Sequence, residues 1–161
     1  MSERRVDPLR SPVRVDYLIH AGHVTGAFLE ALEERRLVGR RCPACHKVYI
    51  PPRSICPTCA EPCTERVEVG PRGTVTTFSV VRFPFEGQRL PPPYACAHVL
   101  LDGADVPLLH IVADCPVDDL RMGLRVEPVW ADTLEPSLAV VRFFRPSGEP
   151  DADYDSFRGH V

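Results

Sequence analysis

Residues 41–60 read RCPACHKVYIPPRSICPTCA and contain two Cys-x2-Cys units separated by ten residues. Each unit is a short knuckle whose two thiolates can reach one ion, and two such knuckles complete a tetrahedral shell. The ten-residue gap is still long enough for a hairpin to bring the second pair opposite the first. We therefore predict that one metal ion is held by four thiolates, those of Cys42, Cys45, Cys56 and Cys59.

Four cysteine ligands leave no open position for water or substrate, so the predicted role of the metal is structural. Zinc is the expected ion, and iron is an alternative because rubredoxin-like sites use the same four thiolates. Two other interpretations are reduced cysteines in a site that has lost its ion, and a redox-active pair. A thioredoxin-like pair would need a βαβ context, which the loop at Pro51-Pro52-Arg53 does not provide. Cys63, Cys96 and Cys115 are expected to be small buried hydrophobic residues.

The composition limits the class of protein. The chain has 161 residues, of which 44% are hydrophobic, which is enough for one main domain with an appendage. The cysteine count of seven is odd and no secretory signal is present, which favours a metal site over a disulfide scaffold. No segment reaches the ~20 apolar residues of a transmembrane helix, so we expect a cytoplasmic protein without membrane contact. The net charge of −3 disfavours nucleic acid as a partner, because that affinity depends on lysine and arginine.

The N-terminal part of the chain divides into an arm and a helix. Residues 1–24 form the arm, which begins with a run rich in charge and proline. The helix is predicted over residues 25–40, with Thr25 as its cap and Gly39 near its end. Its apolar stripe packs either on the chain's own core or on another protein. The stripe consists of Phe28, Leu29 and Leu32.

After the cysteines, short β-rich runs alternate with Gly, Pro and Asp clusters that favour turns. We predict a mainly β fold in which residues 41–65 form a ribbon around the metal and residues 66–146 form a small antiparallel barrel of five or six strands. Residues 147–161 are polar and should be a tail or a docking strap. The predicted strands are Val67–Val69, Gly73–Val81, Tyr94–Leu101, Val106–Ala113, Arg125–Trp130 and Ala139–Phe144.

A set of short motifs extends over residues 25–145. They are RLVGRRCPAC (36–45), YIPPR (49–53), CPTC (56–59), GPRGTV (70–75), PPY (92–94), VLLDG (99–103) and GLRV (123–126). In this combination the sequence resembles the DUF35 family. It departs from the family's pattern after each knuckle, where glycine is common and this chain has His46 and Ala60. A side chain costs on the order of 1 kcal/mol in the left-handed backbone of such a position.

The resemblance implies both a fold and a function. DUF35 proteins have an N-terminal helix, a rubredoxin-like zinc ribbon and a C-terminal OB-fold. They are accessory subunits or domains of enzymes that act on acyl-CoA thioesters, among them thiolases, hydroxymethylglutaryl-CoA synthase, and the thiolase-fold aldolases and MaoC-type hydratases of steroid side-chain degradation. In these assemblies the helix and ribbon dock on the partner, and the barrel admits or shields the acyl-CoA. The resemblance therefore implies a scaffold protein rather than a catalyst.

The residues themselves offer no catalytic motif. None of the six histidines stands beside a nucleophile in a recognisable pattern, and no phosphate-binding glycine loop follows a predicted strand. Two rival functions remain. The first is an OB-fold that binds single-stranded nucleic acid, which the acidic balance and the few aromatic residues disfavour. The second is a free-standing acyl-CoA lyase or hydrolase, which would need a catalytic constellation.

Two groups of residues are candidates for ligand and partner contacts. The phosphates of CoA favour arginine, and its adenine stacks on aromatic or guanidinium planes, so the loop at residues 84–93 is a candidate border of an acyl-CoA path. The alternative is a solvated loop packed by its own aromatic residues. Apolar side chains of the arm and helix are candidates for partner docking. The acyl-CoA candidates are Arg72, Arg82, Phe83, Phe85 and Arg89, and the docking candidates are Tyr17, Leu18, Phe28, Leu29 and Leu32.

Overall fold

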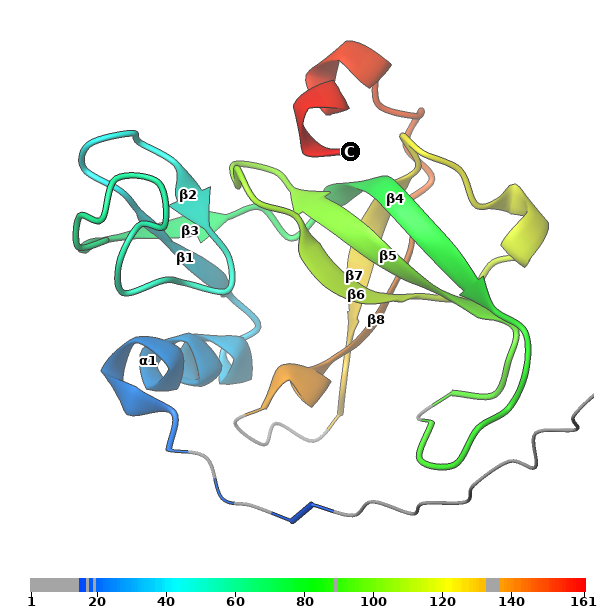
Figure 1. Cartoon of the computed structure of the whole chain (residues 1–161). Coiled ribbons are helices and arrows are strands. Elements are labelled where there is room, and N and C mark those ends of the chain that lie inside the picture. The colour runs from blue at the N-terminus through cyan, green and yellow to red at the C-terminus, as the bar shows by residue number, and fades with distance from the viewer. Residues whose placement is uncertain (1–14, 17, 19, 89, 133–136) are drawn as a thin grey trace, which may run out of the picture.

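The computed structural model describes residues 15–161 except 17, 19, 89 and 133–136. In chain order, a helix is followed by a three-stranded sheet, a closed barrel and a C-terminal segment that returns to the barrel (Figure 1). The predicted mainly β class is confirmed. None of the helices in the described residues is long and apolar enough to cross a membrane.

Helix α1 spans Gly22–Glu33 and turns its apolar side toward the chain's own core. Phe28 and Leu32 are 3% and 1% exposed, and Leu29 packs against the same core. The sequence left open whether this stripe packs on the chain's own core or on another protein, and the structure shows that it packs on the core. Phe28 and Leu32 are therefore not available to a partner while α1 stays packed. Thr25 does not cap the helix, which begins at Gly22.

The last part of the predicted helix is a strand instead. Strand β1 spans Leu37–Arg41, and the helix ends before it because Arg35 adopts a left-handed φ of 58°. Gly39 is not a helix terminator. It lies where β1 crosses β2, Val48–Tyr49, and a Cβ at this position would be 2.6 Å from the Tyr49 carbonyl oxygen. The close approach of two backbones explains the glycine.

The ribbon sheet has the strand order β2-β1-β3, with β3 at Glu65–Val69. Strands β1 and β3 are antiparallel, from the pair Leu37–Val69 to the pair Arg41–Glu65. The predicted strand at Val67–Val69 therefore belongs to the ribbon and not to the barrel.

The barrel is closed and has the strand order β4-β5-β6-β8-β7. Three of its strands have the predicted bounds, while β6 is shorter than predicted and β8 is shifted toward the C-terminus. The interior is filled by apolar side chains that include Val75, Val99, Val126 and Phe144, all 0% exposed. The strands are β4 (Gly73–Val81), β5 (Tyr94–Leu101), β6 (Leu108–Val112), β7 (Arg125–Trp130) and β8 (Val141–Pro146), with short 3-10 turns at Val117–Asp119 and Leu138–Val140.

Residues 147–161, called the C-terminal strap below, pack on the barrel. They contain two 3-10 turns, Tyr154–Ser156 and Arg158–His160. Phe157 between these turns is 3% exposed and lies over Gly123, whose carbonyl accepts a hydrogen bond from the Ala152 amide at 2.9 Å. Of the two predictions for this segment, a tail or a strap, the packing is that of a strap.

The close approach at Gly39 can be tested by substitution. Gly39→Ala should lower the free energy of unfolding by about 1–3 kcal/mol, because the β1 and β2 backbones would have to separate. Gly26→Ala in α1 is the matched control. A Cβ there would meet nothing within 4 Å, and alanine stabilises a helix by up to about 1 kcal/mol relative to glycine. Thermal unfolding should show a lower Tm for the first variant only, and equal Tm values would contradict the packing of Gly39.

Candidate functional site

The two knuckles bring all four predicted ligands into one cluster. Their sulfur atoms lie within 4.8 Å of one another, and the Sγ atoms of Cys45 and Cys56 are 3.7 Å apart. A tetrahedral zinc site with bonds of about 2.3 Å places its sulfurs about 3.8 Å apart, so the cluster has the size of a zinc shell. Cys42 and Cys56 are buried, while Cys45 and Cys59 are half-buried.

The backbone of both knuckles has the expected left-handed residue. His46 and Ala60 have φ values of 62° and 58°, and their amides donate to the carbonyls of Cys42 and Cys56 at 2.9 Å. In each knuckle the amide of the second cysteine also points at the sulfur of the first, at 3.5 and 3.4 Å. Donors aimed at a sulfur stabilise its thiolate form, which is the form that binds metal.

Tyr49 is a member of this site that the sequence analysis missed. It lies in β2, is 4% exposed, and its hydroxyl is 3.2 Å from the Sγ of Cys56. This hydrogen bond lowers the pKa of the Cys56 thiol to about 6 and raises the pKa of the Tyr49 hydroxyl to about 12. The only signal in the sequence was a lone tyrosine between the two knuckles.

The neighbouring thiols oppose each other's ionisation. The pKa of Cys59 is raised to about 12, chiefly because its thiol is hydrogen-bonded to Cys45 and secondly because it is buried. Four thiolates this close therefore require the charge of a cation. Cys63 is buried as expected, and burial raises its pKa, so it stays a neutral thiol beside the cluster. Cys96 and Cys115 are only half-buried, and Cys115 lies outside the strands.

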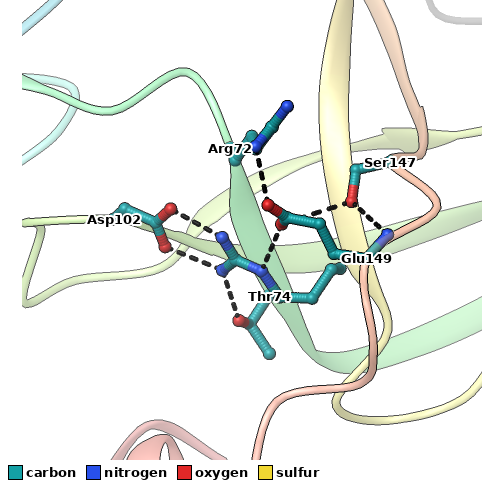
Figure 2. Close-up of polar contacts among 6 residues, drawn as sticks. Arg72, Thr74, Asp102, Ser147 and Glu149 are labelled. Carbon is teal, nitrogen blue, oxygen red and sulfur yellow. Dashed lines mark hydrogen bonds and ion pairs between the residues drawn. The ribbon is translucent and has the colours of Figure 1, made fainter.

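A second polar cluster centres on Arg125, the first residue of β7. Its guanidinium donates to both carboxylate oxygens of Asp102 at 2.7 and 2.6 Å, to Thr74 Oγ1 at 3.0 Å, and to Glu149 at 3.1 Å. Arg72 also donates to Glu149, at 2.6 Å. Figure 2 shows Thr74, Asp102 and Glu149 converging on one guanidinium. We call these five residues the charged junction. The side chain of Arg125 is 15% exposed, and its pKa is raised chiefly by the hydrogen bonds that it donates to Asp102.

The charged junction connects the ribbon, the barrel and the C-terminal strap. Asp102 begins the turn between β5 and β6, and Asp105 in the same turn exchanges two hydrogen bonds with Val48 of the ribbon, at 2.8 and 3.0 Å. Glu149 belongs to the strap. A cavity of about 700 Å³ lies between this turn and the strap, and it is lined in part by Phe157 and His160. Because Arg125 is already paired with two carboxylates, it offers little attraction to a phosphate group.

The described acyl-CoA candidates lie at opposite ends of β4. Arg82, Phe83 and Phe85 lie together on the loop that follows β4, and Phe83 and Phe85 are 82% and 57% exposed. Arg72 lies before the other end of β4, a strand about 30 Å long, and is engaged by Glu149. Arg89 lies outside the described residues.

The docking candidates are also divided. Among the described candidates, Leu18 is 84% exposed, whereas Phe28 and Leu32 are on the side of α1 that is buried against the core. Leu29 is half-buried against the core. Tyr17 lies outside the described residues.

A zinc ribbon joined to a closed five-stranded barrel defines the class of the protein. Family models for the rubredoxin-like zinc ribbon domain and the C-terminal OB-fold domain of ChsH2 match residues 29–62 and 66–131. The metal is therefore a structural zinc. A DUF35 domain-containing scaffold protein of Methanocaldococcus jannaschii is 31% identical over 118 residues, which are 72% of this chain and 82% of the relative. The chain belongs to the DUF35 family.

Two further proteins are similar over most of the chain. A solved chain of the Ltp2-ChsH2(DUF35) aldolase superposes with a TM-score of 0.59 and 30% identity, over 75% of this chain and 92% of that chain. A probable enoyl-CoA hydratase alpha subunit of Thermomonospora curvata is 31% identical over 120 residues. That match covers 74% of this chain but 36% of the subunit, so it concerns one part of a longer protein.

The zinc affinity should depend on pH in a defined way. Zinc displaces the protons of its thiol ligands, so the affinity falls as the pH is lowered. Because the pKa of Cys56 is about 6, this sulfur has no proton to lose above that pH and has one below it. The slope of the logarithm of Kd against pH should therefore steepen by one proton as the pH falls through about 6. Competition with a chelator of known affinity across this range measures it, and a constant slope would contradict the assignment of Cys56.

Proposed function

We propose that the chain is a non-catalytic accessory subunit of an acyl-CoA-processing complex. The partner in this proposal is a thiolase-fold enzyme, such as a thiolase or a retro-aldolase of steroid side-chain degradation, with a MaoC-type hydratase as a further member. The main support is the match to a solved chain of the Ltp2-ChsH2(DUF35) aldolase. The two chains are 30% identical, and the match covers 92% of the aldolase chain. Relatives named as scaffold proteins support the same role.

The chemistry of the described residues supports a role without catalysis. The only metal-ligand cluster found among them is the group of four cysteines, and its coordination shell is complete. The charged junction has its ionic groups paired within the chain, which suits a structural contact better than a reactive one. Reaction at an acyl thioester would therefore be carried out by groups of the partner.

Nucleic-acid binding has less support from the fold. OB-folds bind nucleic acid mainly across their second and third strands, which here are β5 and β6. Neither Tyr94–Leu101 nor Leu108–Val112 contains a lysine or an arginine. A single-stranded backbone would find no positive groove on these strands.

The loop after β4 is the part of the barrel that we propose for the border of the acyl-CoA path. Its tip is braced by Gln88, whose side chain accepts from the Phe85 amide at 2.6 Å and donates to the Leu90 carbonyl at 2.5 Å. The brace fixes the backbone at Phe85, and both Phe83 and Phe85 are exposed. The side chain of Arg82 is 58% exposed, and its ion pair with the Asp118 carboxylate is long, at 3.8 Å, so its charge is available to a phosphate.

Co-expression with a thiolase-fold enzyme encoded beside it tests the scaffold role. We expect the enzyme to be retained on the tagged chain and to lose activity with acyl-CoA in its absence. Leu18→Asp should weaken retention by about tenfold, because it places a charge in an apolar contact. Val161→Asp, at another exposed apolar position, is the control. An enzyme that is fully active alone and does not co-elute would refute the proposal.

The loop is tested separately in the assembled complex. Arg82→Ala should raise the Kd for a short acyl-CoA by about 3- to 10-fold, the size of one exposed charge contact with phosphate. Arg72→Ala is the matched control, because this arginine bonds Glu149 near the other end of β4. If Arg82→Ala left the Kd unchanged while the partner was still retained, the path would be wrong and the scaffold role would stand.

A further inference from the structure

The four zinc ligands differ in how their sulfur atoms are surrounded. Cys42 and Cys56 are buried, and each receives the amide of the second cysteine of its own knuckle. Cys56 also contacts the hydroxyl of Tyr49 at 3.2 Å. Cys45 and Cys59 are half-buried, and within the described part of the chain no amide or hydroxyl is found to donate to their sulfur atoms.

Metal binding fixes the direction of the Tyr49 contact. A zinc-bound cysteine is a thiolate without a proton, so in the loaded site the hydroxyl can only donate to the sulfur. The bond is shielded from water, since Tyr49 is 4% and Cys56 1% exposed. A charge-assisted hydrogen bond in such surroundings is stronger than one at the surface.

The fold holds Tyr49 in place from two sides. Its backbone pairs with Arg40 of β1, and its neighbour Val48 is bonded to Asp105 of the barrel turn at 2.8 and 3.0 Å. The phenol ring is part of the small ribbon core together with Cys42, Cys56 and Cys63. The hydroxyl therefore approaches the sulfur from a fixed direction and is not a mobile side chain that happens to lie nearby.

A donor on a metal-bound thiolate withdraws charge from the sulfur, which makes it a weaker nucleophile. We propose that Tyr49 is a positioning residue of the zinc site, whose hydroxyl stabilises the buried Cys56 thiolate, and that the half-buried Cys45 and Cys59 are the ligands that react first with electrophiles. In the reaction with iodoacetamide, a sulfur lone pair forms the new S–C bond while iodide leaves with the electrons of the C–I bond. The alkylated sulfur is a neutral thioether and a poor zinc ligand, so this attack releases the metal.

Partial alkylation of the zinc-loaded full chain tests the inference without any substitution. The protein is treated with a limiting amount of iodoacetamide, and the modified peptides are counted by mass spectrometry as zinc is released to a colorimetric chelator. We expect the first label on Cys45 or Cys59, and Cys42 and Cys56 to follow only after the zinc has left. Equal labelling of all four cysteines from the start would overturn the proposal.

Tyr49→Phe removes the hydroxyl and keeps the ring in the ribbon core. We expect the zinc Kd to rise by about 10- to 100-fold, the usual effect of losing a group that supports a metal ligand, while Cys56 stays buried and is still labelled late. In the cobalt-loaded protein, the sulfur-to-metal charge-transfer band should move to lower energy. Tyr154→Phe, at an exposed tyrosine of the C-terminal strap, is the control and should change none of these. An unchanged band and an unchanged zinc Kd in Tyr49→Phe would show that the hydroxyl has only a packing role.

Discussion

The zinc–thiolate shell is the constraint on which the ribbon depends. The ribbon's own core consists of Cys42, Tyr49, Cys56 and Cys63, and three of these four side chains are small. A core of this size cannot offset the conformational entropy of the chain that it orders, which is about 1–2 kcal/mol for each residue. Structural zinc contributes on the order of 10 kcal/mol to the folding of such a unit. The ribbon sheet packs on the main core through Leu37, Val48 and Val69, and the metal takes the place of an apolar core around the knuckles.

The order imposed by the metal extends into the barrel through backbone contacts. The amide of Val48 in β2 donates a hydrogen bond to the Asp105 carboxylate, which fixes the turn between β5 and β6. Asp102 in the same turn accepts two hydrogen bonds from Arg125. Arg125 in turn binds Glu149 and so fastens the C-terminal strap. Each partner matters because a nearly buried guanidinium is costly when any of its hydrogen bonds is lost. The three parts of the chain are therefore joined through one turn.

The elements that are predicted correctly from the sequence are those with local signals. Strands β4, β5 and β7 have their predicted bounds because clusters of glycine, proline and aspartate lie beside them, and the spacing of the knuckles was sufficient to predict the cluster of four cysteines. The elements and contacts that are predicted wrongly or missed depend on residues distant in the sequence. Residues 37–40, predicted as helix, are strand because they pair with β3, and the bond between Arg125 and Asp102 joins residues 23 positions apart. Tyr49 was missed because no spacing rule connects a tyrosine with a thiolate.

The arrangement of the barrel also bears on how a partner is accommodated. The end of the barrel at the charged junction is occupied by the chain's own turn, strap and ribbon contact, and its arginines are paired with carboxylates. The other end of β4 leads into a loop whose Phe83 and Phe85 are exposed and whose tip is braced by Gln88. An ordered loop loses little entropy when it is bound, and exposed aromatic side chains are the groups that interfaces bury most favourably. The junction thus serves the internal assembly of the chain, and we infer that the loop end serves contacts with other molecules.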